Sequence, residues 1–221
     1  MRNIKIIYLC LFAIQSLSAQ KLDVEIYELE NGLRVYLNED KSATKVFGSV
    51  WVKAGGKNDP ADATGIAHYL EHMLFKGTRD LGTLDYSKEK PHLDTIMMLY
   101  DQLGAIGDDK ARMVIQKKIN EQELMASEYA IPNEFDQLLK SIGSTGVNAT
   151  TSHDRTNYYN YFPSNQIFRW LDIYAHRFQN PVFRLFQSEL ETVYEEKNRA
   201  SDDLQRRVIQ AFNKNTYLGI Y

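Results

Sequence analysis

Cysteine is nearly absent from this sequence: Cys10 is the only one in 221 residues. A chain with a single cysteine closes no disulfide within itself, so its core must stabilise the fold. Net charge is small, at −3, and does not point to nucleic acid as a partner. Internal repeats, low-complexity tracts and apolar runs long enough to span a membrane are also missing. What is present is 43% hydrophobic and 12% aromatic residues, which is enough for one globular domain or part of a larger one.

The first nineteen residues differ from the rest of the chain. Arg2 and Lys5 precede an apolar run over residues 6–14, and small and polar residues follow as far as Ala19. This order is typical of a secretory signal peptide over residues 1–19. We therefore expect an exported chain, periplasmic or secreted, although an uncleaved anchoring N-terminus is an alternative interpretation.

Three stretches predict β-strands. The turn residues Asn31 and Gly32 precede an alternating run over residues 33–37, which predicts a strand with one buried face. Residues 44–54 predict a second strand. Residues 144–162 combine glycine, β-branched residues and tyrosines, and they predict two further strands joined by a turn.

Helical patterns fill most of the remaining sequence. A helix capped by Asp62 or Thr64 is expected after the second strand. Residues 84–142 are rich in Met, Leu, Lys, Glu and Gln and predict a helical insert, mainly a two-helix hairpin whose methionine-rich face serves packing. Two more helices are expected after residue 164, the second running from about Leu185 through residue 212.

The order of these elements defines the fold class. Two strands, a helix, the helical insert, two strands and two helices follow one another along the chain. This order predicts an α+β fold with a mainly antiparallel sheet packed against helices and a helical-hairpin insert.

The stretch "GIAHYLEHMLFKGT", residues 65–78, contains the strongest chemical signal. On a helix, His68 and His72 lie one turn apart on the same face and can direct ring nitrogens at one metal ion. Glu71 lies near that face without having to bind the ion. A zinc ion brings the pKa of a water toward about 7, and a neighbouring carboxylate can take the proton.

The motif alone leaves two interpretations open. Histidine is more often a surface or capping residue than a metal ligand, so a surface helix with two titratable histidines is the alternative. A catalytic zinc site needs a third protein ligand, which must come from elsewhere in the chain. Because the glutamate directly precedes the second histidine, the pattern is the inverted H-x-x-E-H type rather than H-E-x-x-H.

The sequence at this point resembles the inverted-zincin peptidases, the family that includes pitrilysin, insulin-degrading enzyme and the mitochondrial processing peptidase. The stretches "NATTSHDRTNYY" and "RFQNPVFRLFQSELETVYEEKNRASDD" resemble further family segments in the same order. The resemblance covers most of residues 25–205. Its main departure is the insert at residues 84–142, which lengthens the separation between the motif and the third ligand.

The resemblance implies a role for individual residues. His68 and His72 match the family's zinc ligands, and Glu71 matches its general base. The third ligand is the second acid of the pair in "ETVYEEKNRA", which is Glu196, with Glu195 as the near alternative. Glu189, two helical turns earlier, resembles an acid that supports the site.

Two residues resemble the family's substrate-facing strand edge. They are Asn148 and Ala149, where a substrate backbone would add as an extra strand. Considered alone, Asn148 is equally well interpreted as a turn residue. The remaining histidines, His92, His153 and His176, receive no role.

The resemblance implies an exported zinc metalloendopeptidase that hydrolyses peptides or unfolded segments, with one Zn²⁺ per chain. Residues 20–221 would form its N-terminal domain, truncated at the C-terminus. A C-terminal half or partner subunit would complete the site, so the isolated chain is expected to have little activity; neither nucleic acid nor a stable membrane span is expected. The alternatives are a non-catalytic peptide-binding or assembly subunit and, ranked last, a zinc-stabilised structural domain, because no fourth ligand is evident.

Overall fold

The computed structural model of the chain describes residues 23–216. The chain divides into two compact units, with the boundary between Ala43 and Thr44. The signal peptide that the sequence predicts, residues 1–19, lies outside the described residues.

The first unit contains a β-hairpin. Its strands, β1 (Val24–Glu28) and β2 (Arg34–Asn38), pair antiparallel, and Asn31 Oδ1 in the turn accepts a hydrogen bond from the N–H of Leu33 at 3.1 Å. The predicted turn and strand are therefore confirmed. The predicted buried face is wrong, since Leu33 and Leu37 are 51% and 43% exposed. A hairpin of two strands has no second layer of its own against which to bury a face.

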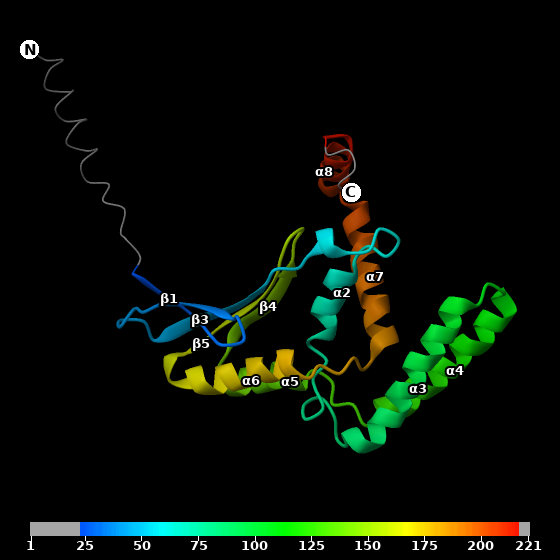
Figure 1. The fold of residues 1–221 in the computed structure, drawn as a ribbon, viewed down its shortest axis with the longest axis horizontal. Helices are drawn as coiled ribbons and strands as arrows, with labels where there is room; N and C mark the ends of the chain where they lie inside the picture. The colour runs from blue at the N-terminus through cyan, green and yellow to red at the C-terminus, as the bar shows by residue number, and fades with distance from the viewer. Residues whose placement is uncertain (1–22, 217–221) are drawn as a thin grey trace, which may run out of the picture. The chain divides into compact units, whose positions relative to one another are not determined.

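The second unit is built on a three-stranded antiparallel sheet. Its strands are β3 (Lys45–Val52), β4 (Thr145–Thr151) and β5 (Thr156–Pro163), in the order β3-β5-β4. The central strand β5 pairs along its whole length with β3. The strand β4 forms one edge of this sheet and follows the insert in sequence, as Figure 1 shows.

Two helices cover one face of this sheet. They are α5 (Glu134–Ser141) and α6 (Ile167–Gln179), which lie side by side in Figure 1. Gly48 in β3 lets α6 approach closely, because a Cβ there would lie 2.5 Å from the Trp170 ring. Leu171 in α6 is half exposed, so it does not belong to the buried side. The buried residues of this core are Phe135, Leu139, Ile142, Tyr158, Phe162, Trp170 and Tyr174.

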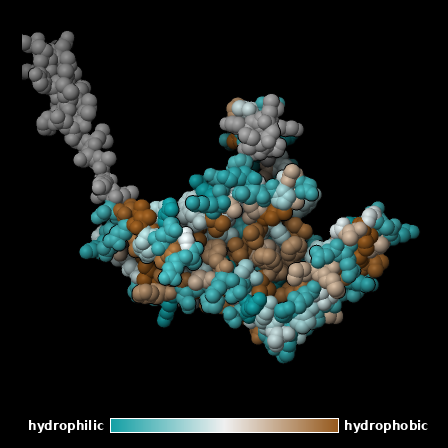
Figure 2. Space-filling view, in the orientation of Figure 1, coloured by the Kyte–Doolittle hydropathy of each residue, from teal (hydrophilic) through white to brown (hydrophobic). Residues whose placement is uncertain are grey.

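The insert contains the predicted helical hairpin. Its helices, α3 (Tyr86–Ala105) and α4 (Asp109–Ser127), begin at Asp85 and Asp108, whose side chains accept hydrogen bonds from backbone N–H groups of the first turn. The hairpin has a small core of its own, made of Ile96, Leu99, Ile115, Ile119 and Ala126. These residues fill the stripe between the helices. The methionines predicted to pack are instead exposed: Met97, Met98, Met113 and Met125. Figure 2 shows that hydrophobic residues reach the surface of the hairpin.

The motif helix is α2 (Ile66–Met73), which follows the short 3₁₀ helix η1 (Gly56–Asn58). The prediction that Asp62 or Thr64 caps it is wrong. Asp59 takes that role, because its carboxylate accepts hydrogen bonds from two backbone N–H groups at the start of α2, at 2.7 and 2.8 Å.

The C-terminal part contains two helices where one was predicted. They are α7 (Phe186–Asp202) and α8 (Leu204–Thr216). The chain leaves helical geometry at Asp203, whose side chain accepts a hydrogen bond from the N–H of Arg206 and so starts α8. A second 3₁₀ helix, η2 (Ser164–Gln166), precedes α6.

The three-stranded antiparallel sheet packed against helices, with a helical hairpin inserted, makes this an α+β fold, as the sequence predicts. None of the helices within residues 23–216 combines the length and the apolar character needed to cross a membrane.

Candidate metal centre

His68 and His72 project from the same side of α2. Their Nε2 atoms lie 3.3 Å apart, and their rings meet edge to face with centroids 4.8 Å apart. This arrangement follows from helical geometry, which places residues four apart one turn above each other. Two imidazole nitrogens are thus close enough to bind one ion.

A carboxylate from α7 completes the group. Oε2 of Glu196 lies 3.7 Å from Nε2 of His68 and 3.6 Å from Nε2 of His72. Its neighbour Glu195 is exposed and lies outside this cluster. Within the described residues, His68, His72 and Glu196 are the His, Cys, Asp and Glu side chains that converge closely enough for a metal ion.

The spacing of these three atoms fits zinc. Tetrahedral Zn²⁺ with bonds of 2.0–2.2 Å places neighbouring ligand atoms about 3.3–3.6 Å apart. The separations in the cluster, 3.3, 3.6 and 3.7 Å, are close to these values. Two imidazoles and one carboxylate also form the donor set of a catalytic rather than a structural zinc site. The side chain of Glu196 is 40% exposed, so water can reach the site.

Glu189, two helical turns before Glu196 on α7, contacts the nitrogen of His72 that does not face the cluster. Its Oε1 lies 2.8 Å from Nδ1 of His72, and its Oε2 forms a close ion pair with Lys76. A carboxylate accepts hydrogen bonds, so Nδ1 carries a proton, and in the neutral, metal-binding form of the ring the lone pair of Nε2 faces the cluster. Burial alone would raise the pKa of Glu189, but the hydrogen bonds from His72 and Lys76 outweigh it and keep this pKa low.

The charge around His72 favours its cationic form in the absence of a metal. The hydrogen bond to Glu189 raises the pKa of His72, burial opposes this, and the charges of Glu196 and Glu71 raise it further. Three carboxylates around one imidazole are an environment that favours a cation. The site is therefore electrostatically suited to a divalent metal ion.

Glu71 is buried within the site. It is 6% exposed, and its Oε2 accepts a hydrogen bond from the hydroxyl of Thr151 at the end of β4. This buried carboxylate lies on the helix that carries both histidines, outside the group of three.

The two predicted substrate-binding residues lie on β4. Asn148 and Ala149 pair with Tyr159 and Tyr158 of β5, and no further strand pairs with β4 within the described residues. The side chain of Asn148 accepts a hydrogen bond from the N–H of Ala149 at 2.9 Å and donates one to the hydroxyl of Tyr159. Both residues are thus at a sheet edge, while Thr151 of the same strand reaches Glu71.

The sequence did not predict the two side chains that contact the acids around the cluster. Lys76 and Thr151 contact Glu189 and Glu71 respectively, but a lone lysine or threonine carries no recognisable motif. Lys76 could have been suspected, because it lies one helical turn beyond His72 on the same stretch.

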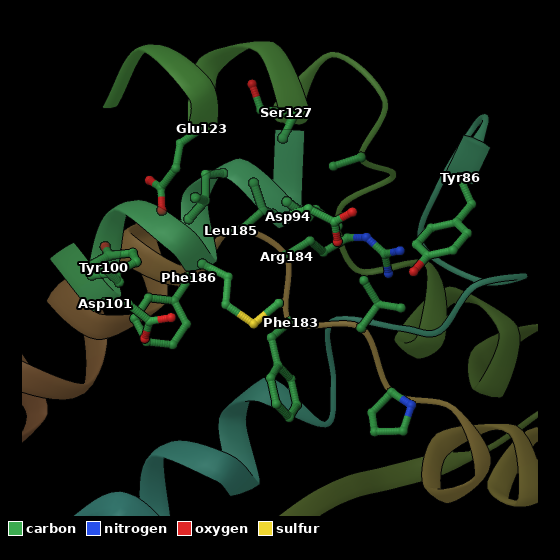
Figure 3. Close-up of a pocket in the computed structure, with 17 residues that line it drawn as sticks. Tyr86, Asp94, Tyr100, Asp101, Glu123, Ser127, Phe183, Arg184, Leu185 and Phe186 are labelled. Carbon is green, nitrogen blue, oxygen red and sulfur yellow. The ribbon is translucent and has the colours of Figure 1, made fainter. Parts of the chain in front are cut away.

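The helical hairpin also contacts the start of α7. Glu123 of α4 accepts a hydrogen bond from the N–H of Gln187 at 3.1 Å, and the hydroxyl of Tyr100 in α3 donates one to the side chain of Gln187 at 2.8 Å. Figure 3 shows both residues reaching from the hairpin toward Phe186. They line a cavity of ≈ 410 Å³ between the hairpin and residues 181–186, and neither histidine of the cluster borders it.

Known proteins resemble parts of this chain. The chain is 36% identical over 55 residues to an uncharacterized zinc protease, YmxG, of Bacillus subtilis, a match covering 25% of this chain and 13% of that protein. It is 39% identical over 72 residues to the bovine (Bos taurus) mitochondrial-processing peptidase subunit beta, covering 33% and 14%. It is 30% identical over 156 residues to human (Homo sapiens) insulin-degrading enzyme, covering 71% and 10%. The matched segments thus span less than a sixth of the length of these relatives.

A solved structure shares the fold. The crystal structure of a protease from Helicobacter pylori superposes with a TM-score of 0.56 at 23% identity, covering 82% of this chain and 32% of that one. The sequence profile of the insulinase family, peptidase family M16, matches residues 34–90 and 123–219, which is more than half of the chain and leaves out the middle of the hairpin. The chain therefore belongs to the insulinase family of peptidases, family M16.

Proposed function

We propose that this chain is the metal-binding part of an exported, zinc-dependent metalloendopeptidase that hydrolyses peptides or unfolded protein segments. The observation that carries the proposal is the convergence of His68, His72 and Glu196 within 4.8 Å, with the buried Glu71 on the same helix. Membership of a peptidase family supports the reaction class. The zinc protease among the relatives supports the choice of metal.

Each side chain has a distinct task in this proposal. His68, His72 and Glu196 hold the zinc ion, and Glu189 fixes the ring of His72. The ion, when bound, would act as a Lewis acid: it would polarise the scissile carbonyl and lower the pKa of a water, so that the water loses a proton and becomes nucleophilic. Glu71 takes a proton from the attacking water and passes it to the leaving amine. Because Thr151 donates to Oε2 of Glu71, Oε1 is the oxygen that we assign to this proton transfer.

The edge of β4 is the surface that we assign to the substrate. An extended peptide that adds there as a strand gains backbone hydrogen bonds without a requirement for particular side chains. Its backbone would replace the Asn148 side chain as the partner of the Ala149 N–H. Such binding favours peptides and unfolded segments, because a folded protein offers few free backbone groups.

Activity in this proposal needs a C-terminal half or a partner subunit. The matches cover only 14% and 10% of two relatives, and one of these is named as a subunit. We expect the isolated chain to bind zinc but to cleave peptides slowly or not at all. Export follows from the predicted signal over residues 1–19.

Zinc content is the first test. The purified chain should contain about one zinc ion, Glu196→Gln should lower its zinc affinity sharply, and the matched exchange Glu195→Gln in the next residue should not. Glu71→Gln should keep the metal. A folded parent without zinc, or equal losses in the Glu195 and Glu196 variants, would contradict the proposed site.

Peptide cleavage is the second test, with an unfolded fluorogenic substrate. In a longer form or complex that contains this chain, the reaction should be chelator-sensitive and should be lost in Glu71→Gln, whose amide cannot accept the proton. The isolated chain should show little or no cleavage. If a metal-loaded form cleaves as fast with Glu71→Gln as without it, the mechanism is wrong. If zinc binds but no fragment or complex containing the chain cleaves anything, the non-catalytic peptide-binding subunit is the better description.

Export has its own readout. When the chain is produced in a bacterium with a periplasm, the mass of the recovered protein should correspond to cleavage near Ala19. Recovery of the uncleaved chain from the cytoplasm would contradict this part of the proposal.

A further inference from the structure

Arg184 and Glu89 form a fully buried ion pair beside the candidate metal centre. Nε of Arg184 donates to Oε1 of Glu89 at 2.8 Å and Nη2 donates to Oε2 at 3.0 Å, and the two side chains are 2% and 0% exposed. Glu89 lies in the first turns of α3. Arg184 comes directly before Leu185, the residue that caps α7, and Figure 3 shows it next to Leu185 and Phe186.

The remaining donors of Arg184 bind the loop that follows α2. Nη1 donates to the carbonyl oxygens of Lys76 and Leu81 at 2.8 and 3.0 Å, and Nη2 donates to that of Thr78 at 2.8 Å. Together with the bonds to Glu89, these contacts use all five N–H groups of the guanidinium. One side chain thus joins α3, the end of α2 and the start of α7.

The loop is shaped around this guanidinium. Gly77 and Gly82 have φ values of +106° and +83°, and a Cβ at either position would lie 2.8 Å from Nη1 of Arg184. The N–H of Val182 also donates to the carbonyl of Gly77 at 3.0 Å. A Cβ at Gly77 would lie closest to the carbonyl oxygen of Leu81, and one at Gly82 closest to that of Lys76. Larger residues at these glycines would therefore displace the two carbonyls that accept from Nη1.

A continuous set of contacts leads from Arg184 to the cluster. The carbonyl of Lys76 accepts from Arg184, while the ammonium of the same lysine pairs with Oε2 of Glu189. Oε1 of Glu189 then bonds to Nδ1 of His72. Arg184 is thus connected to His72 through Lys76 and Glu189, and α2 and α7 carry all three atoms of the cluster.

We propose that Arg184, fixed by Glu89, is a positioning residue for the zinc site: it sets the separation of α2 and α7 at which Glu189 and Glu196 meet the two histidines. This inference rests on the proposed zinc binding. It also gives α3 a role, since this helix supplies the carboxylate that orients Arg184. Lysine cannot replace Arg184, because its single ammonium cannot serve five acceptors spread over α3 and the loop after α2.

The competing explanation is that the pair only stabilises the fold. Replacing both members of a buried ion pair by apolar residues often leaves stability unchanged or increases it, whereas removing one member is strongly destabilising. The paired exchange Arg184→Met with Glu89→Leu therefore separates stability from positioning. An apolar pair restores packing but provides none of the bonds to the loop carbonyls.

The test measures the unfolding midpoint and the zinc dissociation constant on the full chain, using competition with a chromogenic chelator. We expect Arg184→Lys and the paired variant to bind zinc about tenfold or more weakly, in the range seen when groups that orient metal ligands are lost. The paired variant should do so even though its unfolding midpoint recovers relative to the single exchanges. Cobalt(II) bound in place of zinc should show an altered visible spectrum in the same variants, because that spectrum depends on ligand geometry.

A control variant and three outcomes complete the test. Lys140→Gln removes an exposed ion pair with Asp136 and should leave zinc affinity unchanged. A paired variant that recovers its midpoint and binds zinc like the parent would overturn the inference. Should the paired variant fail to fold, Glu89→Gln decides: parental zinc affinity in that folded variant overturns the inference, and weakened affinity supports it. A parent that binds no zinc would instead refute the proposed function.

Discussion

Oε1 of Glu189 and Nδ1 of His72 are 2.8 Å apart, and this contact links the two helices on which the metal cluster depends. It orients the imidazole so that Nε2 faces Nε2 of His68 and Oε2 of Glu196. The same carboxylate binds Lys76 through its other oxygen. The orientation of His72 is therefore determined by contacts outside the cluster itself.

Exchange of Glu189 should weaken metal binding without unfolding the chain. In Glu189→Gln the amide can still accept from Nδ1, but it no longer adds negative charge and cannot pair with Lys76. We expect zinc affinity to fall about 10- to 100-fold. Glu191→Gln, an exposed exchange on the same helix, is the control. Equal affinities in both variants and the parent would show that the contact has no role in metal binding.

Arg177 offers a second prediction, about stability. Its guanidinium carbon lies 4.3 Å from the ring centroids of both Phe75 and Phe135, and the rings of Tyr158 and Tyr174 are also close, at 5.1 and 4.7 Å. Within the described residues none of its three nitrogens has a hydrogen-bond partner, and burial lowers its pKa to about 10. Its aromatic contacts are worth about 0.5–2 kcal/mol, which has to offset the cost of a desolvated charge.

We therefore expect Arg177→Met to change the free energy of unfolding by less than about 1 kcal/mol or to raise it, because methionine fills the space without a buried charge. Arg177→Ala leaves a cavity and should cost about 2–4 kcal/mol. Urea denaturation measures both. If the methionine variant is destabilised as much as the alanine variant, the charge on the guanidinium is needed for folding.

Alkaline pH should destabilise the chain, in part through Tyr100. Burial raises the pKa of this phenol to about 12, helped by the charges of Glu123 and Glu191. Its pKa in the unfolded chain is about 10. A group whose pKa is raised on folding contributes stability that is complete below the unfolded value. This contribution is lost as pH rises from about 10 to about 12.

The measurement is the urea midpoint as a function of pH above 9. Tyr100→Phe should show a shallower decline than the parent, since phenylalanine has no proton to lose. Tyr194→Phe is the control, because Tyr194 is exposed in the structure. Identical slopes for the parent and Tyr100→Phe would contradict the burial of this hydroxyl.

The extent to which the sequence predicts this structure differs between elements. The strand pattern, the helical hairpin and the histidine-bearing helix follow from local periodicity and turn residues, because each signal is complete within a short window. The cap of α2 was wrongly predicted, because the residue that caps it, Asp59, lies six residues before Gly65, on the other side of a loop. The break at Asp203 was missed because the helical pattern continues on both sides of it.

The residues of the candidate site also differ in how far the sequence predicts them. His68, Glu71 and His72 form a local motif, so spacing alone suggests their proximity. Glu196 lies far along the chain, and its place was predicted through family resemblance rather than from spacing. Contacts such as Lys76 with Glu189 or Arg184 with Glu89 depend on how helices pack, and a single sequence carries no signal for them.

The last prediction concerns the start of α7, where the hairpin supplies a cap that the chain does not supply locally. Leu185 occupies the capping position with φ +57° and has no side-chain hydrogen bond to offer, while Glu123 of α4 accepts from the N–H of Gln187. Glu123→Ala leaves this donor without its carboxylate and should cost about 1 kcal/mol of stability. Burial raises the pKa of Glu123, so its charge is not favoured there.

Glu123→Gln keeps an oxygen acceptor and removes the buried charge, so we expect it to be as stable as the parent or more stable. Glu121 is exposed and lies two residues earlier on α4, so the exchange Glu121→Ala should have little effect. Urea denaturation of the three variants distinguishes the possibilities. Destabilisation by Glu123→Gln as large as that by Glu123→Ala would mean that the negative charge at the start of α7 stabilises the helix, rather than the hydrogen bond itself.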